Sequence, residues 1–323
     1  MSRTLTTWIA AAAALLLAVP LAGAQQVTTL KAVNAFQEGT YYARNFERFV
    51  KKVNDEGKGL LQINYLGGPK AIPTMEQGAA LRNGVVDLAN TTTSFVAGLS
   101  PESLSVNYAT VSWAEMRKNG TVDFLNKLMM EKGLYYYART GDGVPYHIYL
   151  NKKIDKADLT GLKIRIAPIY REFFTRMGAS VMQVAPGEVF TALERGVVDG
   201  YGWPLLGIFD LGWHEKTKYR VDPGFYNIEL GVMFSAKTWN ALTQPQKDFL
   251  NKQAVWLESL NADMAGKDAP AELKRQADAG IQVIKLPDAE AKKLLTLSQE
   301  AGWAGVIAAS PQHGPQLRKL MAP

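Results

Sequence analysis

The chain has 323 residues, a formal net charge of +6, three histidines and no cysteine. The lack of cysteine excludes thiol catalysis and cysteine-ligated metals, and His147, His214 and His313 lack the i, i+4 spacing of a helical zinc pair. We therefore expect no metal and no other cofactor. Lysine and arginine are scattered among acids and form no stripe, which argues against nucleic acid as a partner.

The first 24 residues have the pattern of a secretory signal peptide. Arg3 gives a positive start, an apolar stretch runs from Trp8 to Leu21, and Ala22-Gly23-Ala24 offers a small-residue cleavage site. The apolar stretch is shorter than the ~20 residues that a membrane-spanning helix needs. We expect an exported, soluble protein that begins at Gln25 and works in the periplasm.

The next segment alternates between strand and helix signals. Residues 30–33 have strand composition, and residues 41–54 place apolar side chains at helical spacing up to a glycine-rich stop. Residues 61–65 alternate as a second strand, and Gly67-Gly68-Pro69 turns the chain toward another helix. The predicted order is β-α-β-α-β.

One spaced pattern occurs twice in the chain. Glu76-x4-Leu81-x2-Gly84-Val85-Val86-Asp87 returns as Glu188-x4-Leu193-x2-Gly196-Val197-Val198-Asp199. Each copy predicts a short helix, a glycine that takes positive φ, and a strand. A strand, helix and strand also precede the second copy, so we expect two similar lobes with parallel strands and a ligand crevice between them. The repeated acids Glu188 and Asp199 are interpreted as structural.

Helices dominate the chain after Ser235. A long helix from about Gln244 to Met264 and a second from about Pro270 to Ala279 are expected, followed by a strand at 282–284. Amphipathic helix fills the remainder. No low-complexity linker separates the lobes, which indicates that the chain crosses between them more than once.

Ligands bind beyond the carboxyl ends of parallel strands, and unusual residues mark those ends here. Phe36 and Glu38 follow the first strand, and the hydroxyl-rich loop Thr91 to Ser94 follows the first repeat. In the second half, Arg165 lies within a strand and the repeat leads into Tyr201-Gly202-Trp203-Pro204. We expect these four segments to face one another.

Several of these residues also form an ordered motif. Leu159-Thr160-Gly161-Leu162-Lys163-Ile164-Arg165 is followed by Gly178-Ala179, the second repeat and Trp203-Pro204. This order resembles the DctP-type periplasmic substrate-binding proteins of TRAP transporters. The resemblance implies an α/β, two-lobed periplasmic-binding-protein-like fold with a long helix late in the chain. It also implies a receptor that closes on an organic acid and delivers it to a TRAP membrane permease.

The resemblance implies that the late helices cross between the lobes. Lobe I is expected to comprise residues 25–145 plus about 232–268, and lobe II residues 146–231 plus about 269–323. We expect a monomer that has these two lobes.

The resemblance further implies that Arg165 pairs with the ligand's carboxylate. A guanidinium is a planar group of donors that binds a carboxylate through two hydrogen bonds. It therefore selects a negatively charged ligand and fixes the orientation of the ligand's carboxylate. The alternative is an arginine at a strand edge that pairs with a surface acid.

Two departures from the family pattern affect which ligand we expect. Trp203 stands where some members have a polar ligand contact, and Pro145-Tyr146-His147 has no second arginine. The other expected ligand contacts are Phe36, Glu38, Tyr41, Tyr146, His147, Thr92, Thr93, Ser94 and Tyr201, with Trp113 as a further candidate. Aromatic walls favour one carboxylate on an apolar or aromatic body, such as a branched or aromatic 2-oxo or 2-hydroxy acid. Glu38 would repel an acid but could anchor a hydrogen bond between the lobes.

Other interpretations of the sequence remain open. The aromatic residues could belong to the lobe cores, and the ligand could be a C4-dicarboxylate or a sugar acid. A receptor for an ATP-driven permease or a sensor would share the fold. A periplasmic enzyme would need a catalytic motif, and the chain has no Gly-x-Ser-x-Gly elbow, phosphate loop or metal pair. We expect that the protein is not an enzyme and has no catalytic residues.

Overall fold

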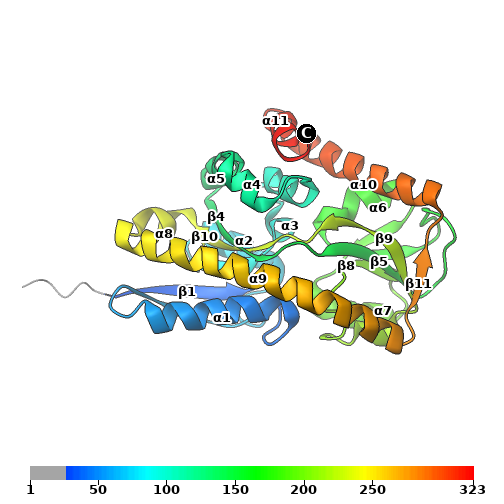
Figure 1. Cartoon of the computed structure of the whole chain (residues 1–323), viewed down its shortest axis with the longest axis horizontal. Helices are drawn as coiled ribbons and strands as arrows, with labels where there is room; N and C mark the ends of the chain where they lie inside the picture. Colours follow the sequence, from blue (N-terminus) through cyan, green and yellow to red (C-terminus); the bar gives the residue numbers. More distant parts are fainter. Residues whose placement is uncertain (1–26) are drawn as a thin grey trace, which may run out of the picture.

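The computed structural model describes residues 27–323, so the expected signal peptide lies outside the described residues. Two lobes, each built on its own β-sheet, lie side by side along the molecule (Figure 1). Within residues 27–323, every helix is too short or too polar to cross a membrane.

Lobe I contains a five-stranded sheet in the order β2-β1-β3-β10-β4. The first three strands pair in parallel, and β10 pairs antiparallel with β3 and β4. The strands are β1 (Thr28–Asn34), β2 (Leu61–Tyr65), β3 (Leu88–Thr91), β4 (Leu134–Gly141) and β10 (Leu230–Ser235). The helices are α1 (Tyr41–Glu56), η1 (Thr74–Glu76), α2 (Gln77–Arg82), α3 (Thr93–Val96), η2 (Pro101–Tyr108), α4 (Trp113–Lys118), α5 (Thr121–Glu131) and α8 (Ala236–Ala241).

Lobe II contains a six-stranded sheet in the order β11-β9-β5-β8-β6-β7. The strands β7, β6 and β8 are parallel, as the alternation of strands and helices predicts. The strands are β5 (Pro145–Leu150), β6 (Lys163–Ile166), β7 (Ser180–Gln183), β8 (Gly200–Pro204), β9 (Tyr219–Asn227) and β11 (Gln282–Lys285). The helices are η3 (Pro168–Tyr170), α6 (Arg171–Arg176), η4 (Pro186–Glu188), α7 (Val189–Glu194) and η5 (Trp213–Lys216).

The repeated motif has the same structure in both lobes. Gly84 and Gly196 end their helices at φ 71° and 65°, where a side chain would be strained. The Asp87 carboxylate accepts the backbone N–H of Lys31 at 2.7 Å, and the Asp199 carboxylate accepts that of Lys163 at 2.9 Å. Each aspartate therefore ties the start of the strand after the repeat to its parallel neighbour, β3 to β1 in lobe I and β8 to β6 in lobe II.

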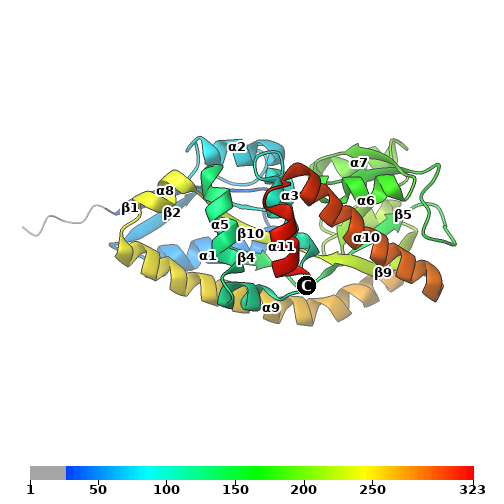
Figure 2. The same cartoon turned by 90° about the horizontal axis from the view of Figure 1, so that it is seen from above.

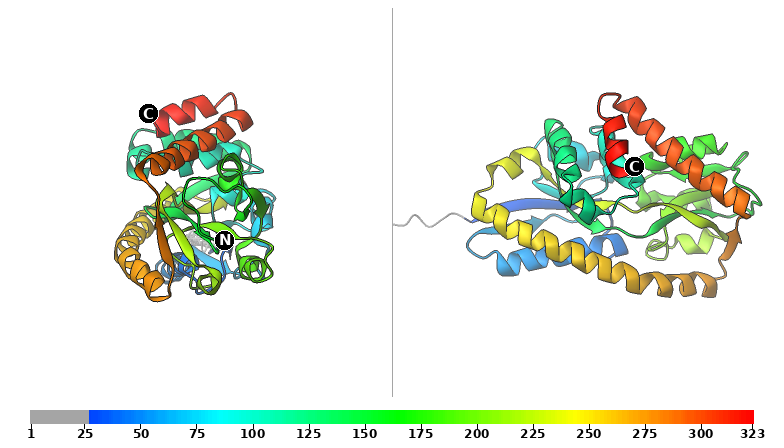
Figure 3. Two further views of the ribbon diagram at one scale, coloured as in Figure 1. Left: turned by 90° about the vertical axis from the view of Figure 1, so that its right-hand side faces the viewer. Right: turned by 45° about the horizontal axis from the view of Figure 1, so that its top comes forward.

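The chain passes between the lobes through residues 142–144, through residues 228–229 and along α9 (Gln244–Asp278). The expectation of two helices here is wrong, because α9 is one helix of 35 residues that contains Pro270. Leu257 before the proline and Gln276 after it are both buried, so packing outweighs the hydrogen bond that proline cannot make. Figure 3 shows α9 along the full length of the molecule.

The C-terminal segment returns to lobe I. After β11, helix α10 (Asp288–Ala309) packs against both α6 and η2, and α11 (Gly314–Met321) packs against η2 and α5 (Figure 2). The carbonyl oxygen of Met321 accepts the backbone N–H groups of Thr110 and Val111 at 2.8 and 3.1 Å. The sequence analysis assigned residues 269–323 to lobe II, whereas the structure packs the last helix on lobe I.

Candidate functional site

Two cavities lie between the lobes at the carboxyl ends of the parallel strands. The larger, the outer chamber, has a volume of about 350 Å³ and is lined by Phe36, Glu38, Tyr42, Lys70, Gly187, Trp203 and Asp210, among others. The smaller, the inner pocket, has a volume of about 30 Å³ and is lined by Phe36, Tyr42, Ser94, Phe95, Tyr146, Trp203 and Glu229, among others. The first volume suits a small organic ligand, whereas the second suits about one water molecule.

Three aromatic rings line both cavities, and we call them the aromatic triangle. Phe36 and Tyr42 come from lobe I, and Trp203 comes from lobe II. Their ring centroids are 5.7 Å apart for Phe36 and Tyr42, 6.3 Å for Phe36 and Trp203, and 5.8 Å for Tyr42 and Trp203. The triangle therefore exists only when the lobes are together.

Arg165 lies on β6 with its side chain fully buried. Its Nε donates to the carbonyl oxygen of Val184 at 2.8 Å, and its Nη1 donates to that of Gly202 at 3.4 Å. Its Nη2 is buried and has no hydrogen-bond partner within residues 27–323. Burial lowers the pKa of Arg165 to about 10, so the group remains protonated at neutral pH. A buried cation with an unused donor is a place where an anion would bind favourably.

The Arg165 guanidinium lies behind the aromatic triangle. Its central carbon is 5.6 Å from the centre of the Trp203 ring and 5.9 Å from that of Trp213. Trp203 lines both cavities, whereas Arg165 lines neither. The Trp203 ring therefore lies against the guanidinium and also lines both cavities.

The structure brings some of the predicted ligand contacts to the cavities. Phe36, Thr92, Ser94, Tyr146 and Trp203 line the inner pocket, and Phe36, Glu38 and Trp203 line the outer chamber. Among residues 27–323, no hydrogen bond joins the Glu38 side chain to lobe II, so the expected anchor between the lobes is not formed.

Other predicted contacts lie away from both cavities. The His147 ring nitrogen Nδ1 lies 3.0 Å from the Val221 carbonyl oxygen and 3.1 Å from Asp222, on the neighbouring strand β9. Tyr201 is buried, and its hydroxyl contacts Thr217 at 2.8 Å. These two side chains are occupied by contacts inside lobe II.

Three more candidates have structural contacts in or beside lobe I. Tyr41 stands at the start of α1 beside α9, outside both cavities. Thr93 uses its backbone N–H and its hydroxyl to bind Glu229. Trp113 lies in the core of lobe I, where its indole N–H donates to Glu258 at 3.0 Å.

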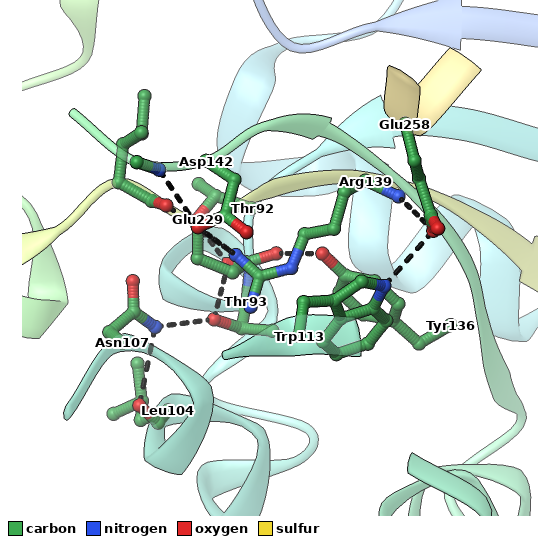
Figure 4. Close-up of polar contacts among 12 residues, drawn as sticks. Thr92, Thr93, Leu104, Asn107, Trp113, Tyr136, Arg139, Asp142, Glu229 and Glu258 are labelled. Carbon is green, nitrogen blue, oxygen red and sulfur yellow. Dashed lines mark hydrogen bonds and ion pairs between the residues drawn. The ribbon is translucent and has the colours of Figure 1, made fainter. Parts of the chain in front are cut away.

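Among the side chains at the site, Glu229 accepts the most hydrogen bonds, and the sequence analysis did not identify it. It lies in the crossing between β9 and β10 and accepts four hydrogen bonds (Figure 4). The donors are the Thr92 hydroxyl at 2.9 Å, the Thr93 N–H at 2.7 Å, the Thr93 hydroxyl at 2.6 Å and the Tyr136 hydroxyl at 2.6 Å. The one available sequence signal was a lone acid directly before the apolar run Leu230-Gly231-Val232-Met233-Phe234.

A buried arginine lies close to this carboxylate. The Arg139 guanidinium stacks 4.5 Å from the centre of the Trp113 ring and lies 3.6 Å from Asp142 (Figure 4). Burial acts to lower the pKa of Arg139, but the combined charges of Tyr136, Asp142, Glu229 and Glu258 raise it above its ordinary value. Arg139 therefore carries its charge among several acids at the crossing, although its buried Nε, like Nη2 of Arg165, has no hydrogen-bond partner within residues 27–323.

The lobes also touch directly at both ends of the cleft. The Asp210 carboxylate of lobe II accepts the Tyr41 N–H at the start of α1 and lies 3.7 Å from Arg44. At the other end, Ser94 accepts the Ile169 N–H at 3.2 Å, and the Tyr108 hydroxyl donates to the Ile169 carbonyl oxygen at 3.2 Å. These contacts define a closed arrangement of the lobes.

In the part of the chain that the structure describes, no three His, Asp or Glu side chains are grouped so that they could hold a metal ion. The site consists instead of one unpaired buried guanidinium, an aromatic triangle and a hydroxyl-rich loop. This composition suits recognition of an organic anion better than metal chemistry.

Known proteins resemble this chain in sequence. The model of the family described as bacterial extracellular solute-binding protein, family 7 (DctP), matches residues 33–302. A monocarboxylate 2-oxoacid-binding periplasmic protein of Nostoc sp. is 24% identical over 221 residues, which cover 65% of this chain and 60% of that protein. The C4-dicarboxylate-binding protein DctB of Bacillus subtilis is 25% identical over 282 residues, which cover 83% of this chain and 79% of that protein.

The fold is also similar to solved structures. A TRAP periplasmic solute-binding protein from Desulfovibrio salexigens with bound orotic acid has a TM-score of 0.81 at 22% identity. The match covers 91% of this chain and 97% of that one, which includes both lobes. Because the family model spans most of its length, the chain belongs to the DctP family, family 7 of the bacterial extracellular solute-binding proteins.

Proposed function

We propose that this protein is a periplasmic receptor that binds a small monocarboxylate through Arg165 and delivers it to a TRAP membrane permease. The favoured ligand is an aromatic or branched 2-oxo or 2-hydroxy acid. The observation that carries the proposal is the buried Arg165 Nη2, which has no partner and lies beside an aromatic-lined chamber. We expect the receptor to act as a monomer.

One carboxylate on an apolar body fits the charges of the cleft. Arg165 is the only arginine that we assign to the ligand, since Arg139 is balanced by the acids around it. Glu229 and Glu38 place negative charge around the cavities, which opposes a second ligand carboxylate. The 2-oxoacid relative and the orotate-bound structure support this class, because both ligands carry one carboxylate.

A dicarboxylate or sugar acid is the alternative, and Lys70 favours it. This lysine lines the outer chamber from an exposed position, where its ammonium group could meet a second anionic group. The Bacillus subtilis relative, named for C4-dicarboxylate binding, also supports this alternative. An enzyme is not favoured, because the matching family is described as solute-binding proteins.

Closure follows from the position of the site between the lobes. A ligand that contacts Arg165 in lobe II and Phe36 in lobe I binds the closed form more tightly than the open form. Only this difference in affinity drives closure.

A thermal-shift screen tests the proposed ligand class. We expect phenylpyruvate or branched 2-oxo acids at ~100 times the dissociation constant to stabilise the protein by about 2.7 kcal/mol and raise its melting temperature by several degrees. Malonate, succinate and galacturonate serve as comparison compounds. If only these comparison compounds raise the melting temperature, the ligand is a dicarboxylate or sugar acid and not the proposed monocarboxylate. If no carboxylate raises the melting temperature, the proposal of a carboxylate receptor is contradicted.

The contact between Asp210 and α1 gives a separate prediction. Asp210→Ala removes an acid that caps a helix of the opposite lobe, so the closed form should lose about 1 kcal/mol. Ligand affinity measured by calorimetry should fall by about fivefold. Asp288→Ala is the matched control, because Asp288 also lies in the first turn of a helix but bridges no lobes. Equal affinities of the Asp210 and Asp288 variants would contradict a role in closure.

A further inference from the structure

A third cavity lies between α9 and the two lobes, and we call it the seam cavity. It has a volume of about 200 Å³ and shares Gly207 and Asp210 with the outer chamber. Its charged and phenolic lining residues come from three segments: Tyr41 and Arg44 from α1, Asp210 from the loop after β8, and Asp268, Glu272 and Arg275 from α9. Because α1 belongs to lobe I and Asp210 to lobe II, the cavity is enclosed in this way only when the lobes are closed.

Glu272 is a buried acid in the wall of this cavity. The residue is only 8% exposed, and its Oε1 is buried without a hydrogen-bond partner within residues 27–323. An ionised carboxylate that loses water on burial needs hydrogen bonds or a positive charge in exchange, whereas a protonated carboxyl group avoids most of that cost. The closed arrangement therefore favours the protonated form of Glu272.

The surroundings of Glu272 act in both directions. Burial is the main cause that raises the pKa of its carboxyl group above the ordinary value, and the charge of Asp210 adds to the increase. The Gln276 side chain, the charge of Arg275 and the Gly207 backbone lower the pKa, but they do not cancel the increase. The acid in the opposite wall of the cavity thus adds to the effect of burial.

Two arginines line the cavity, but both have other contacts. Arg44 lies 3.7 Å from Asp210, and the Arg275 guanidinium stacks 3.9 Å from the centre of the Phe209 ring. Within residues 27–323, neither arginine forms an ion pair with Glu272. The positive charges at the seam therefore leave the Glu272 carboxyl group only partly compensated.

The other titratable groups close to Glu272 are tyrosines, together with one acid. Burial raises the pKa of Tyr41, Tyr149 and Tyr201, so these three hydroxyls keep their protons near neutral pH. Asp268 is half-buried and bonds to the Tyr41 hydroxyl. Tyr41 belongs to lobe I, so opening of the lobes removes it from the seam and exposes Glu272 to water.

We propose that closure of the lobes is linked to proton uptake by Glu272, so that mild acid favours the closed form and strengthens ligand binding. This inference rests on the proposed closure around a ligand and adds a proton to it. In the open form, water reaches Glu272 and its pKa returns toward the ordinary value. The extra stability of the closed form is complete at low pH and is lost as the pH rises through the pKa of the closed form.

The test measures the binding of phenylpyruvate by calorimetry between about pH 5 and pH 8, above the ordinary pKa of an exposed carboxyl group. Phenylpyruvate stays ionised over this range, so its own protonation does not contribute. Each titration is repeated in buffers of different ionisation enthalpy, which counts the protons that are taken up on binding. Galacturonate, which also stays ionised, is the second probe.

We expect the wild type to take up a fraction of a proton on binding and to bind at least about threefold more tightly at the acid end of the range. Glu272→Gln imitates the protonated side chain, so it should bind with the acid affinity throughout. Glu272→Met is a second uncharged variant that should also lose the pH dependence. Asp268→Asn is the matched control, because it removes a half-buried acid from the same cavity and should keep the wild-type pH dependence.

The outcomes separate the two proposals. If the wild type binds either acid with the same affinity across the range, the proton linkage is wrong and the receptor proposal stands. A pH dependence that persists in both Glu272 variants would also overturn the linkage, because another group would then carry the proton. An equal loss in Asp268→Asn would assign the effect to the total charge of the cavity and not to Glu272. If the wild type binds neither acid at any pH, the receptor proposal fails, and the linkage fails with it.

Discussion

Replacing Arg165 with methionine should abolish carboxylate binding and also make the ligand-free protein more stable. The guanidinium is fully buried, its Nη2 lacks a partner, and burial lowers its pKa to about 10, so the empty site carries an uncompensated charge. Methionine fills a similar volume without charge. We expect affinity to fall by at least about a hundredfold and the unfolding free energy to rise by on the order of 1 kcal/mol.

Arg220 provides a matched control in the same sheet. It is also a buried arginine, but it makes two bonds of 3.0 Å to Asp222 and one of 2.9 Å to Gln276. Arg220→Met should therefore destabilise the protein by about 1–3 kcal/mol, since it removes these three bonds and leaves the partly exposed Asp222 with His147 as a partner. Arg165→Lys should bind poorly, because an ammonium group lacks the planar fork. Near-normal affinity in Arg165→Met would show that the carboxylate binds elsewhere.

Replacing Glu229 with alanine should cause the largest loss of stability. Four donors from Thr92, Thr93 and Tyr136 would lose their acceptor in a buried place, and Arg139 would lose a nearby negative charge. We expect the unfolding free energy, measured by urea denaturation, to fall by about 3–5 kcal/mol. Glu229→Gln should lie between alanine and wild type, because its carbonyl oxygen can still accept and the Tyr136 hydroxyl can turn to accept from the amide.

An exposed ion pair gives the comparison for Glu229. Glu194 lies 3.3 Å from Lys216 with about half of its side chain exposed, so Glu194→Ala should change the unfolding free energy by less than about 0.5 kcal/mol. A similarly small effect in Glu229→Ala would contradict a structural role for this carboxylate. It would then be available to contact the ligand.

Local sequence patterns predicted the two-lobed fold, whereas the role of Arg165 in ligand binding stays a prediction. The repeat predicted a helix, a positive-φ glycine and a strand in each lobe, and the structure adds the same aspartate contact in both copies. The resemblance implied the role of Arg165, and a charge inside the apolar strand Ile164-Arg165-Ile166, which needs a partner or a ligand, supported that choice. The unused Nη2 agrees with that argument.

Contacts between distant segments could not be predicted. Glu229 binds Thr92 and Thr93 across more than a hundred residues, and the Tyr42 ring meets Trp203 only because the lobes close. Tyr146 and His147 illustrate a different limit. As neighbours on a strand they point to opposite faces, so the sequence analysis should not have placed both beside the ligand.

The position of β10 determines how the protein can fold. This strand lies between β3 and β4 in the lobe I sheet, yet it follows nearly all of lobe II in the sequence. A nascent chain that ends before residue 230 has two unpaired strand edges in lobe I, which are open to aggregation. The lobe I sheet can therefore be completed only after strands β5 to β9 of lobe II have been synthesised, and such long-range pairing slows folding. Because the segments of the two lobes alternate along the chain, we expect the lobes to fold and unfold together.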